Sequence, residues 1–369
     1  MFTLRLVTML LRTKFAYLVV LALVAGAAAQ MPIPSAGPSA GAQSPQQKPV
    51  AQPSGQPGAQ SPGVQSPGTQ PSDTVQLPAP AQDPSRTDDG MFIFKKDVDE
   101  VVLHATVMDD RRRFVNSLAK TDFHVFENGA PQEIRSFRRE DVPVSVGIII
   151  DNSGSMRDKR PAVNQAALNF VKSSNPEDQV FIVNFNDEYY LDQDFTAKVS
   201  ALKEALDRIE SRGGTAMYDA VVASAEHMKK SSRLEKKVLL VITDGEDNAS
   251  RESLEQAVRK LQEENGPTVY TIGILGEQRA KRARRALQVL AEQSGGISFF
   301  PKDISEVDTI TQQVAHDIRN QYVLIYKSSI PKNVEGYRTV KVEARASGFK
   351  RLQVRTRTGY YPGQERASN

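Results

Sequence analysis

The segment Val144–Ile150 reads VSVGIII and is apolar along nearly its whole length. A strand with one solvated face alternates apolar and polar residues, whereas a strand covered by helices on both faces is apolar throughout. We therefore predict that Val144–Ile150 is a central strand of a sheet that is buried on both sides.

Strands and helices alternate on the C-terminal side of this segment. Further strands are predicted at Gln179–Phe185, Tyr189–Phe195 (a short edge strand), Lys237–Thr243, Thr268–Ile274 and Ile297–Phe300. Helices are predicted at Arg160–Ser174, Ala197–Glu210, Ala216–Lys230, Glu252–Glu264, Arg279–Gln293 and Ile304–Asn320. This order predicts an α/β fold with a doubly wound, mostly parallel sheet flanked by helices.

Shorter strands flank this region at both ends of the chain. Before it come Val98–Met108, Asp122–Glu127 and Glu133–Arg139, and after it come Gln321–Lys327, Tyr337–Ala346 and Lys350–Thr356. Asn128-Gly129 is a strong hairpin signal, so Glu133–Arg139 is expected to return beside Asp122–Glu127. The N-terminal group of strands is too small to form a stable domain on its own. We expect both chain ends to pack into one small β subdomain.

The first residues are typical of an export signal. Basic residues precede the apolar run Phe15–Gly26, and the small residues Ala27–Ala29 offer a cleavage site. We predict a signal peptide over residues 1–29 and a periplasmic, cell-surface or secreted protein. The alternative is an uncleaved anchor, but Pro32 follows too soon for a membrane helix of about 20 residues. No later stretch is apolar enough to span a bilayer.

Residues 30–90 are dominated by Pro, Gln, Ser, Gly and Ala. Such a segment cannot bury enough apolar area to offset its ordering entropy, so we predict a disordered linker. It would be a tether if the signal is retained and a tail if the signal is cleaved. The remaining domains are expected at 143–325 for the α/β unit and at 91–142 and 326–369 for the two parts of the β subdomain.

Composition excludes several classes of function. The chain has no cysteine, which excludes disulfides, thiolate metal sites and a cysteine nucleophile. A net charge of +3, from 47 basic and 44 acidic residues, is too balanced for a dedicated nucleic-acid binder.

Polar residues follow two of the predicted central strands. Asp151-Asn152-Ser153-Gly154-Ser155 comes after the first, Thr243-Asp244-Gly245 ends a later one, and Gly213-Gly214-Thr215 lies in a loop between them. Ligands of doubly wound sheets bind at the carboxyl ends of the strands. Donor sets made only of oxygen select hard cations such as Mg²⁺, Mn²⁺ or Ca²⁺. The competing interpretation is that these residues only cap helices and form turns.

These residues resemble the von Willebrand factor type A domain family. Its metal-ion-dependent adhesion site has the pattern Asp-x-Ser-x-Ser, then Thr, then Asp, which matches Asp151, Ser153, Ser155, Thr215 and Asp244. The stretches Gly213–Ala220 and Ile242–Gly245 are also similar to this family. The resemblance covers about residues 143–325. The flanking stretches Asp122–Gly129 and Gly359–Tyr361 resemble an acidobacterial subgroup of exported proteins related to this family.

The resemblance implies how the site would work. The hydroxyls of Ser153, Ser155 and Thr215 would coordinate the ion directly, while Asp151 and Asp244 would act mainly through water. Mg²⁺ is the expected ion, with Mn²⁺ or Ca²⁺ as alternatives, and an open position would accept an Asp or Glu of a protein partner. This implies a non-enzymatic adhesion module. The alternative is a structural or assembly factor for cell-envelope complexes, in which the metal mainly stabilises the loops.

The resemblance also bears on residues around the five. Asn152 would shape the first loop, and Asp219 and Asp247 would lie further from the ion. In the family the last helix can move on ligand binding, which here would be Ile304–Asn320.

Other chemistries find less support in the sequence. The four histidines are scattered over different elements and predict no zinc site. Asp-Asn-Ser-Gly-Ser is not the Gly-x-Ser-x-Gly of a serine hydrolase, and no Walker A motif is present. The basic cluster at 281–285 is interpreted as a solvated helix face, with contact to an acidic surface as the alternative.

Overall fold

The run VSVGIII forms strand β5 (Val144–Asp151), and every residue of that strand is buried. The computed structural model describes residues 100–139, 141–276 and 280–363. The expected signal peptide and linker lie outside these residues. Strand β5 is a central member of a six-stranded sheet with the order β10-β9-β8-β5-β6-β7. The other strands are β6 (Gln179–Phe185), β7 (Tyr189–Thr196), β8 (Lys236–Thr243), β9 (Thr268–Gly273) and β10 (Ser298–Phe299).

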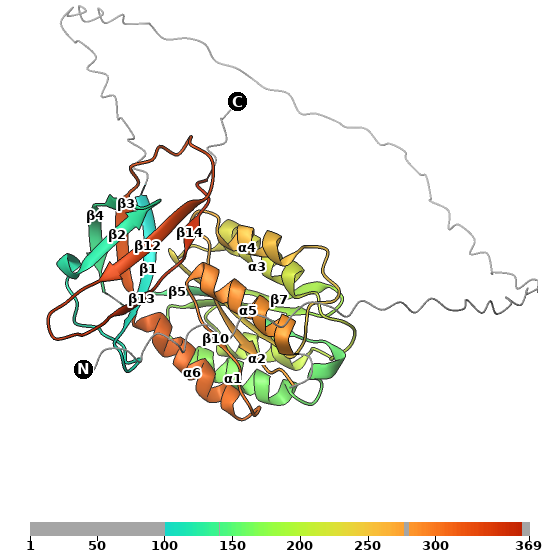
Figure 1. Cartoon of the computed structure of the whole chain (residues 1–369). Helices are drawn as coiled ribbons and strands as arrows, with labels where there is room; N and C mark the ends of the chain where they lie inside the picture. The colour runs from blue at the N-terminus through green and yellow to red at the C-terminus, as the bar shows by residue number, and fades with distance from the viewer. Residues whose placement is uncertain (1–99, 140, 277–279, 364–369) are drawn as a thin grey trace, which may run out of the picture. The chain divides into compact units, whose positions relative to one another are not determined.

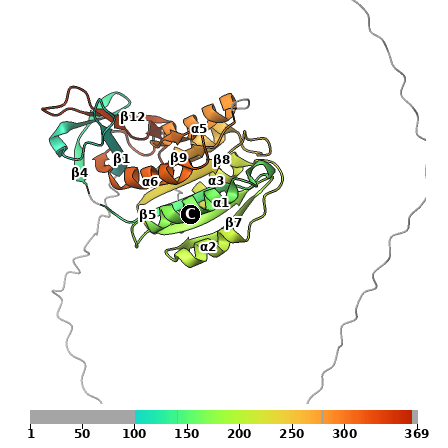
Figure 2. The ribbon, with the colours of Figure 1, turned by 90° about the horizontal axis from the view of Figure 1, so that it is seen from below.

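Five of these strands are parallel, and the edge strand β7 is antiparallel to β6. One face is covered by α1 (Arg160–Lys172), α2 (Val199–Asp207) and α6 (Glu306–Arg319) (Figures 1 and 2). The other face is covered by α3 (Met217–Ser231), α4 (Leu254–Leu261) and α5 (Ala280–Ser294). The predicted doubly wound, mostly parallel sheet is confirmed.

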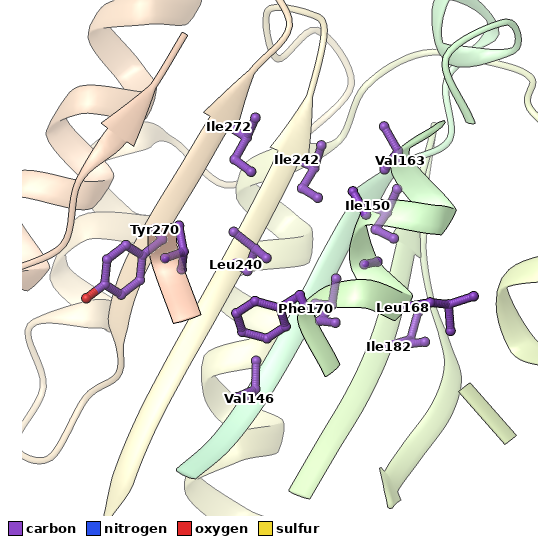
Figure 3. Close-up of a cluster of buried hydrophobic side chains, with 14 of the residues drawn as sticks. Val146, Ile150, Val163, Leu168, Phe170, Ile182, Leu240, Ile242, Tyr270 and Ile272 are labelled. Atoms are coloured by element: carbon purple, nitrogen blue, oxygen red, sulfur yellow. The ribbon is translucent and has the colours of Figure 1, made fainter. Parts of the chain in front are cut away.

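Strand β5 contributes to the hydrophobic clusters on both faces. Its residues Val146, Ile148 and Ile150 pack under α1 and α6, and Ile149 packs under α3 and α5. Figure 3 shows Val146 and Ile150 together with side chains of α1 and β8. Gly147 is required by this packing, because an added Cβ would lie 2.3 Å from the ring of Phe181. The continuous apolar run therefore reflects burial from two sides.

The strands from the two chain ends form two further four-stranded sheets. Their orders are β13-β1-β11-β4 and β14-β12-β2-β3. The N-terminal strands are β1 (Glu100–Met108), β2 (Phe123–Glu127), β3 (Ala130–Gln132) and β4 (Ile134–Arg138), and the C-terminal ones are β11 (Tyr322–Lys327), β12 (Arg338–Ala344), β13 (Gln353–Arg355) and β14 (Gly359–Tyr360).

Early and late strands pair directly in both of these sheets. Strand β1 is antiparallel to β11, and β2 is antiparallel to β12. A single hydrophobic cluster fills the space between the two sheets, with Leu103, Val125, Leu324 and Val342 among its members. The expected β unit built from both chain ends is confirmed, whereas its limits at 142 and 326 stay a prediction.

The hairpin after β2 differs from the expected one. Asn128 and Gly129 have positive φ angles of 47° and 81°, as a two-residue turn requires. The returning strand is β3, however, and the predicted strand Glu133–Arg139 becomes β4, which pairs with β11 in the other sheet. A two-residue turn places Ala130 opposite Glu127, so pairing starts at once. Pro131 hides this short strand from sequence patterns, and its missing N–H is tolerated because β3 is an edge strand.

Within the described ranges, no helix is both long enough and apolar enough to cross a bilayer.

Candidate metal site

Asp151 ends β5 and is completely buried. Its Oδ1 accepts a hydrogen bond of 2.8 Å from the backbone N–H of Ser153, and its Oδ2 accepts one of 2.5 Å from the hydroxyl of Thr243 at the end of β8. Burial raises the pKa of Asp151, and the hydrogen bonds from Ser153 and Thr243 oppose that rise. A cation bound nearby would favour the ionised carboxylate.

Three further oxygen-bearing side chains lie in a row beyond Asp151. The Oγ atoms of Ser153 and Ser155 are 3.1 Å apart, and the Ser155 hydroxyl donates a 2.7 Å hydrogen bond to Oδ1 of Asp244. Neighbouring ligands of an octahedral Mg²⁺ with bonds of about 2.0–2.1 Å lie about 2.9 Å apart. The spacing and the all-oxygen chemistry therefore fit a small hard cation.

Thr215 lies in a loop that is hydrogen-bonded to the loops after β5 and β8. The N–H of Gly154 donates to the carbonyl of Gly213 at 3.2 Å, and the N–H of Thr215 donates to Oδ1 of Asn248 at 2.9 Å. The Thr215 hydroxyl faces Gly245, because a Cβ added to that glycine would lie 3.4 Å from Thr215 Oγ1. The structure thus brings the loops that carry the five predicted residues to the carboxyl edge of the sheet. Their role as metal ligands stays a prediction.

Asn152 joins the first loop to the segment before Thr215. Its Nδ2 donates to the carbonyl of Glu210 at 2.7 Å, and its Oδ1 accepts from the Ser211 hydroxyl at 3.0 Å. Asn152 therefore holds the loop in place with its side chain.

Asp219 and Asp247 fix the loop that follows β8. Asp219 accepts from the backbone N–H groups of Arg251 and Glu252, while Asp247 accepts from the N–H of Tyr218 in the first turn of α3. Both carboxylates are thus engaged in fixing backbone.

Sequence reasoning missed a cationic side chain that contacts the site. The ammonium of Lys159 forms an ion pair with Oδ2 of Asp244 and donates to the carbonyl of Ser155 at 3.3 Å. Lys159 stands directly before α1 and resembles an ordinary surface residue in the sequence. No local pattern signals this contact, because Asp244 lies in a loop 85 residues further along the chain.

Three polar side chains that position the loops were also missed. Thr243 holds Asp151, Asn248 holds Thr215, and Asp187 accepts from the N–H of Gly214 at 2.8 Å. Thr243 stands inside the family-like stretch Ile242–Gly245, so a signal for it existed. Asn248 and Asp187 carry no local signal because they act across loops.

The two histidines for which ring contacts are described lie in aromatic surroundings. His227 stacks on Phe195 and hydrogen-bonds Asp194, and His316 packs against Phe114. Among the described residues, no group of three or more His, Cys, Asp or Glu side chains could hold a metal ion. A site of two carboxylates and three hydroxyls belongs to a different class. On α5, the basic side chains at 281, 282, 284 and 285 are exposed.

Comparison with known proteins gives a family match for the central region. The family model of the von Willebrand factor type A domain matches residues 145–313. The inter-alpha-trypsin inhibitor heavy chain H4 of Bos taurus is 25% identical over 170 residues, which cover 43% of this chain and 17% of that protein. An uncharacterized protein of Synechocystis is 21% identical over 175 residues, covering 46% of this chain and 41% of that protein. The chain thus spans less than half the length of these two relatives.

Solved structures give matches of low identity. A von Willebrand factor type A protein from Catenulispora acidiphila has a TM-score of 0.44 and 16% identity, with 74% of each chain covered. Proximal thread matrix protein 1 from the mussel byssus, with a zinc-occupied MIDAS motif, has a TM-score of 0.42 and 18% identity, covering 52% of this chain and 50% of that chain.

Proposed function

We propose that this protein, whose residues 145–313 match the family model of the von Willebrand factor type A domain, is a non-enzymatic binding module that holds a divalent cation. The hydroxyls of Ser153, Ser155 and Thr215 coordinate the ion directly, and Asp151 and Asp244 act mainly through water. Mg²⁺ is the preferred ion, and Mn²⁺ or Ca²⁺ are the alternatives. The N-terminal signal-like sequence supports an exported protein that works in the periplasm, at the cell surface or in the medium.

The observation that carries this proposal is the chain of contacts from Ser153 through Ser155 to Asp244. Its oxygens are 3.1 and 2.7 Å apart and come from the ends of β5 and β8. Neutral hydroxyl ligands leave the charge of a divalent ion poorly compensated, so the ion would attract a carboxylate from outside. An Asp or Glu side chain of a protein partner supplies that carboxylate.

The contacts of the two serines argue against a simple capping role. Ser153 precedes the short 3₁₀ helix Gly154–Met156, but its side chain makes no capping hydrogen bond. The Ser155 hydroxyl donates to Asp244 in a different loop. Serines that only cap helices or form turns would hydrogen-bond to nearby backbone groups instead. The described partners of both hydroxyls also lack a histidine that could activate a serine nucleophile.

Thermal unfolding of the full-length chain with and without Mn²⁺ or Mg²⁺ tests the metal site. A ligand at 100 times its Kd stabilises the folded state by about 2.7 kcal/mol. We expect a Tm increase of several degrees for the wild type and none for Asp151→Ala. Asp207→Ala is the matched control, because Asp207 is exposed on α2 and pairs with Lys203. Equal stabilisation of wild type and Asp151→Ala would contradict the site.

Chelation separates the adhesion module from the alternative, an assembly factor whose metal only stabilises loops. Binding of an envelope protein to the wild type should be lost in EDTA and in Thr215→Ala, and kept in Thr215→Ser, which retains the hydroxyl. Binding that survives both EDTA and Thr215→Ala would favour the assembly factor.

A further inference from the structure

We propose that Lys159 is a built-in competitor of the divalent cation, and that it sets the metal affinity by neutralising Asp244 until the ion displaces it. This inference rests on the proposed function and concerns the regulation of the same site.

The placement of Lys159 is specific. Its backbone is fixed on both sides, since its N–H donates to the carbonyl of Met156 at 2.9 Å and its carbonyl accepts from the N–H of Val163 at 3.1 Å. Its ammonium contacts Oδ2 of Asp244 and the carbonyl of Ser155, two groups at the candidate metal site. The side chain therefore reaches into the site from a rigid base.

Asp244 needs a positive partner because its side chain is only 1% exposed. Its Oδ1 accepts from the Ser155 hydroxyl, and its Oδ2 carries the ammonium. A buried carboxylate without a counter-charge is strongly disfavoured. Lys159 supplies that counter-charge from within the chain.

A divalent ion among the same oxygens would be repelled by an ammonium that stays in place. The two cations therefore exclude each other at Asp244. The lysine side chain is 33% exposed and has four methylene groups, so its head can move into solvent while its backbone stays fixed. Each binding event of the ion then includes the loss of this ion pair.

The neighbouring basic residue does not share this position. The guanidinium of Arg157 donates to the carbonyl of Ser211 at 3.3 Å, away from Asp244. Arg157 thus belongs to the same loop and carries the same charge without the ion pair. It provides a matched control for the effect of net charge.

The proposal predicts two changes of opposite sign in Lys159→Met. In EDTA the variant should have a lower Tm than the wild type, because Asp244 has lost its counter-charge. Its Mn²⁺ affinity, measured from the free-ion signal in electron paramagnetic resonance on the full-length chain, should be roughly five- to tenfold higher. Arg157→Met should bind Mn²⁺ with an affinity close to that of the wild type. If Lys159 had only a structural role, Lys159→Met would lower the Tm without raising the affinity for Mn²⁺.

The release of Lys159 can be followed directly. Acylation of Lys159 by an amine-reactive ester, measured by mass spectrometry, should increase several-fold when Mn²⁺ is added to the wild type and should stay constant in Asp151→Ala.

Three outcomes would overturn the inference. Equal Mn²⁺ affinity of wild type and Lys159→Met would overturn it and leave the metal site standing. An equal gain in Mn²⁺ affinity in Arg157→Met would show that the effect comes from net charge and not from the ion pair. If neither the wild type nor Lys159→Met binds Mn²⁺, the proposed function falls together with the inference.

Discussion

Glu127 is a fully buried acid at the end of β2. Its carboxylate accepts hydrogen bonds from the hydroxyls of Tyr326 at 2.6 Å, Tyr360 at 2.9 Å and Ser328 at 2.5 Å. The guanidinium of Arg338 lies 3.9 Å away and is also buried. Burial together with the bond to Glu127 raises the pKa of Tyr326, which keeps that phenol a donor. One side chain thus connects strands from both ends of the chain.

Glu127→Ala should destabilise the protein by about 3–5 kcal/mol, because the buried Arg338 loses its counter-ion and the hydroxyls of Tyr326 and Tyr360 lose their acceptor. Urea unfolding measures the change in the free energy of unfolding. Glu133→Ala is the control, since its side chain is 79% exposed and its contact with Arg135 is 3.8 Å long. Exposed pairs of this kind contribute about 0–1 kcal/mol. Similar losses in both variants would contradict the importance of the buried network.

At the scale of elements, the end of α6 is attached to both parts of the described structure. Asp317 of α6 pairs with Arg355 of β13 and accepts hydrogen bonds from Tyr270 of β9 at 2.5 Å and Thr106 of β1 at 3.2 Å. The side chain of Asp317 is 2% exposed. The family resemblance makes this helix the element expected to move, and these contacts anchor its C-terminal end.

A double-mutant cycle with Asp317→Asn and Arg355→Met should reveal this attachment. Residues in one buried network couple by about 0.5–3 kcal/mol, so the double variant should lose less stability than the two single variants added together. A cycle with Lys203→Met and Asp207→Asn, an exposed pair on α2, should give a coupling near zero. Additive losses at Asp317 and Arg355 would show that the ion pair does not connect α6 to β13.

For the molecule as a whole, His104 on β1 makes the free energy of unfolding depend on pH. Burial, followed by the charges of Lys236, Arg357 and Arg138, lowers the pKa of His104 from 6.5 to about 3. Between pH 6.5 and about pH 3 the unfolded chain therefore binds a proton that the folded chain does not. The free energy of unfolding must fall as the pH falls through this range.

His104→Leu should reduce this loss of stability between pH 6.5 and pH 4, as measured by urea unfolding at a series of pH values. The carboxylates of the chain add their own acid dependence to both proteins, so the difference between variant and wild type is the quantity to compare. His124→Leu, at an exposed position of β2, is the control and should follow the wild type. A pH dependence unchanged in His104→Leu would contradict the assignment.

Local sequence patterns were sufficient to predict the central fold and the edge of the sheet at which the candidate site lies. Apolar runs such as Val144–Ile150 and the helical periods between them are local signals of burial. Parallel strands send their carboxyl ends to one edge, so Asp151 and Asp244 were expected to lie near each other. Thr215 stood out only as a hydroxyl in a loop between these strands, and the family resemblance assigned it to the same site.

The partners of the polar side chains, in contrast, follow only from the way in which the elements pack together. The ion pair of Lys159 with Asp244, the buried network of Glu127 and the attachment of Asp317 to Arg355 all join residues far apart in the chain. A local pattern records whether a position is buried, because burial follows the period of its own helix or strand. It does not record which distant charge or hydroxyl lies opposite, because that depends on how complete elements pack together.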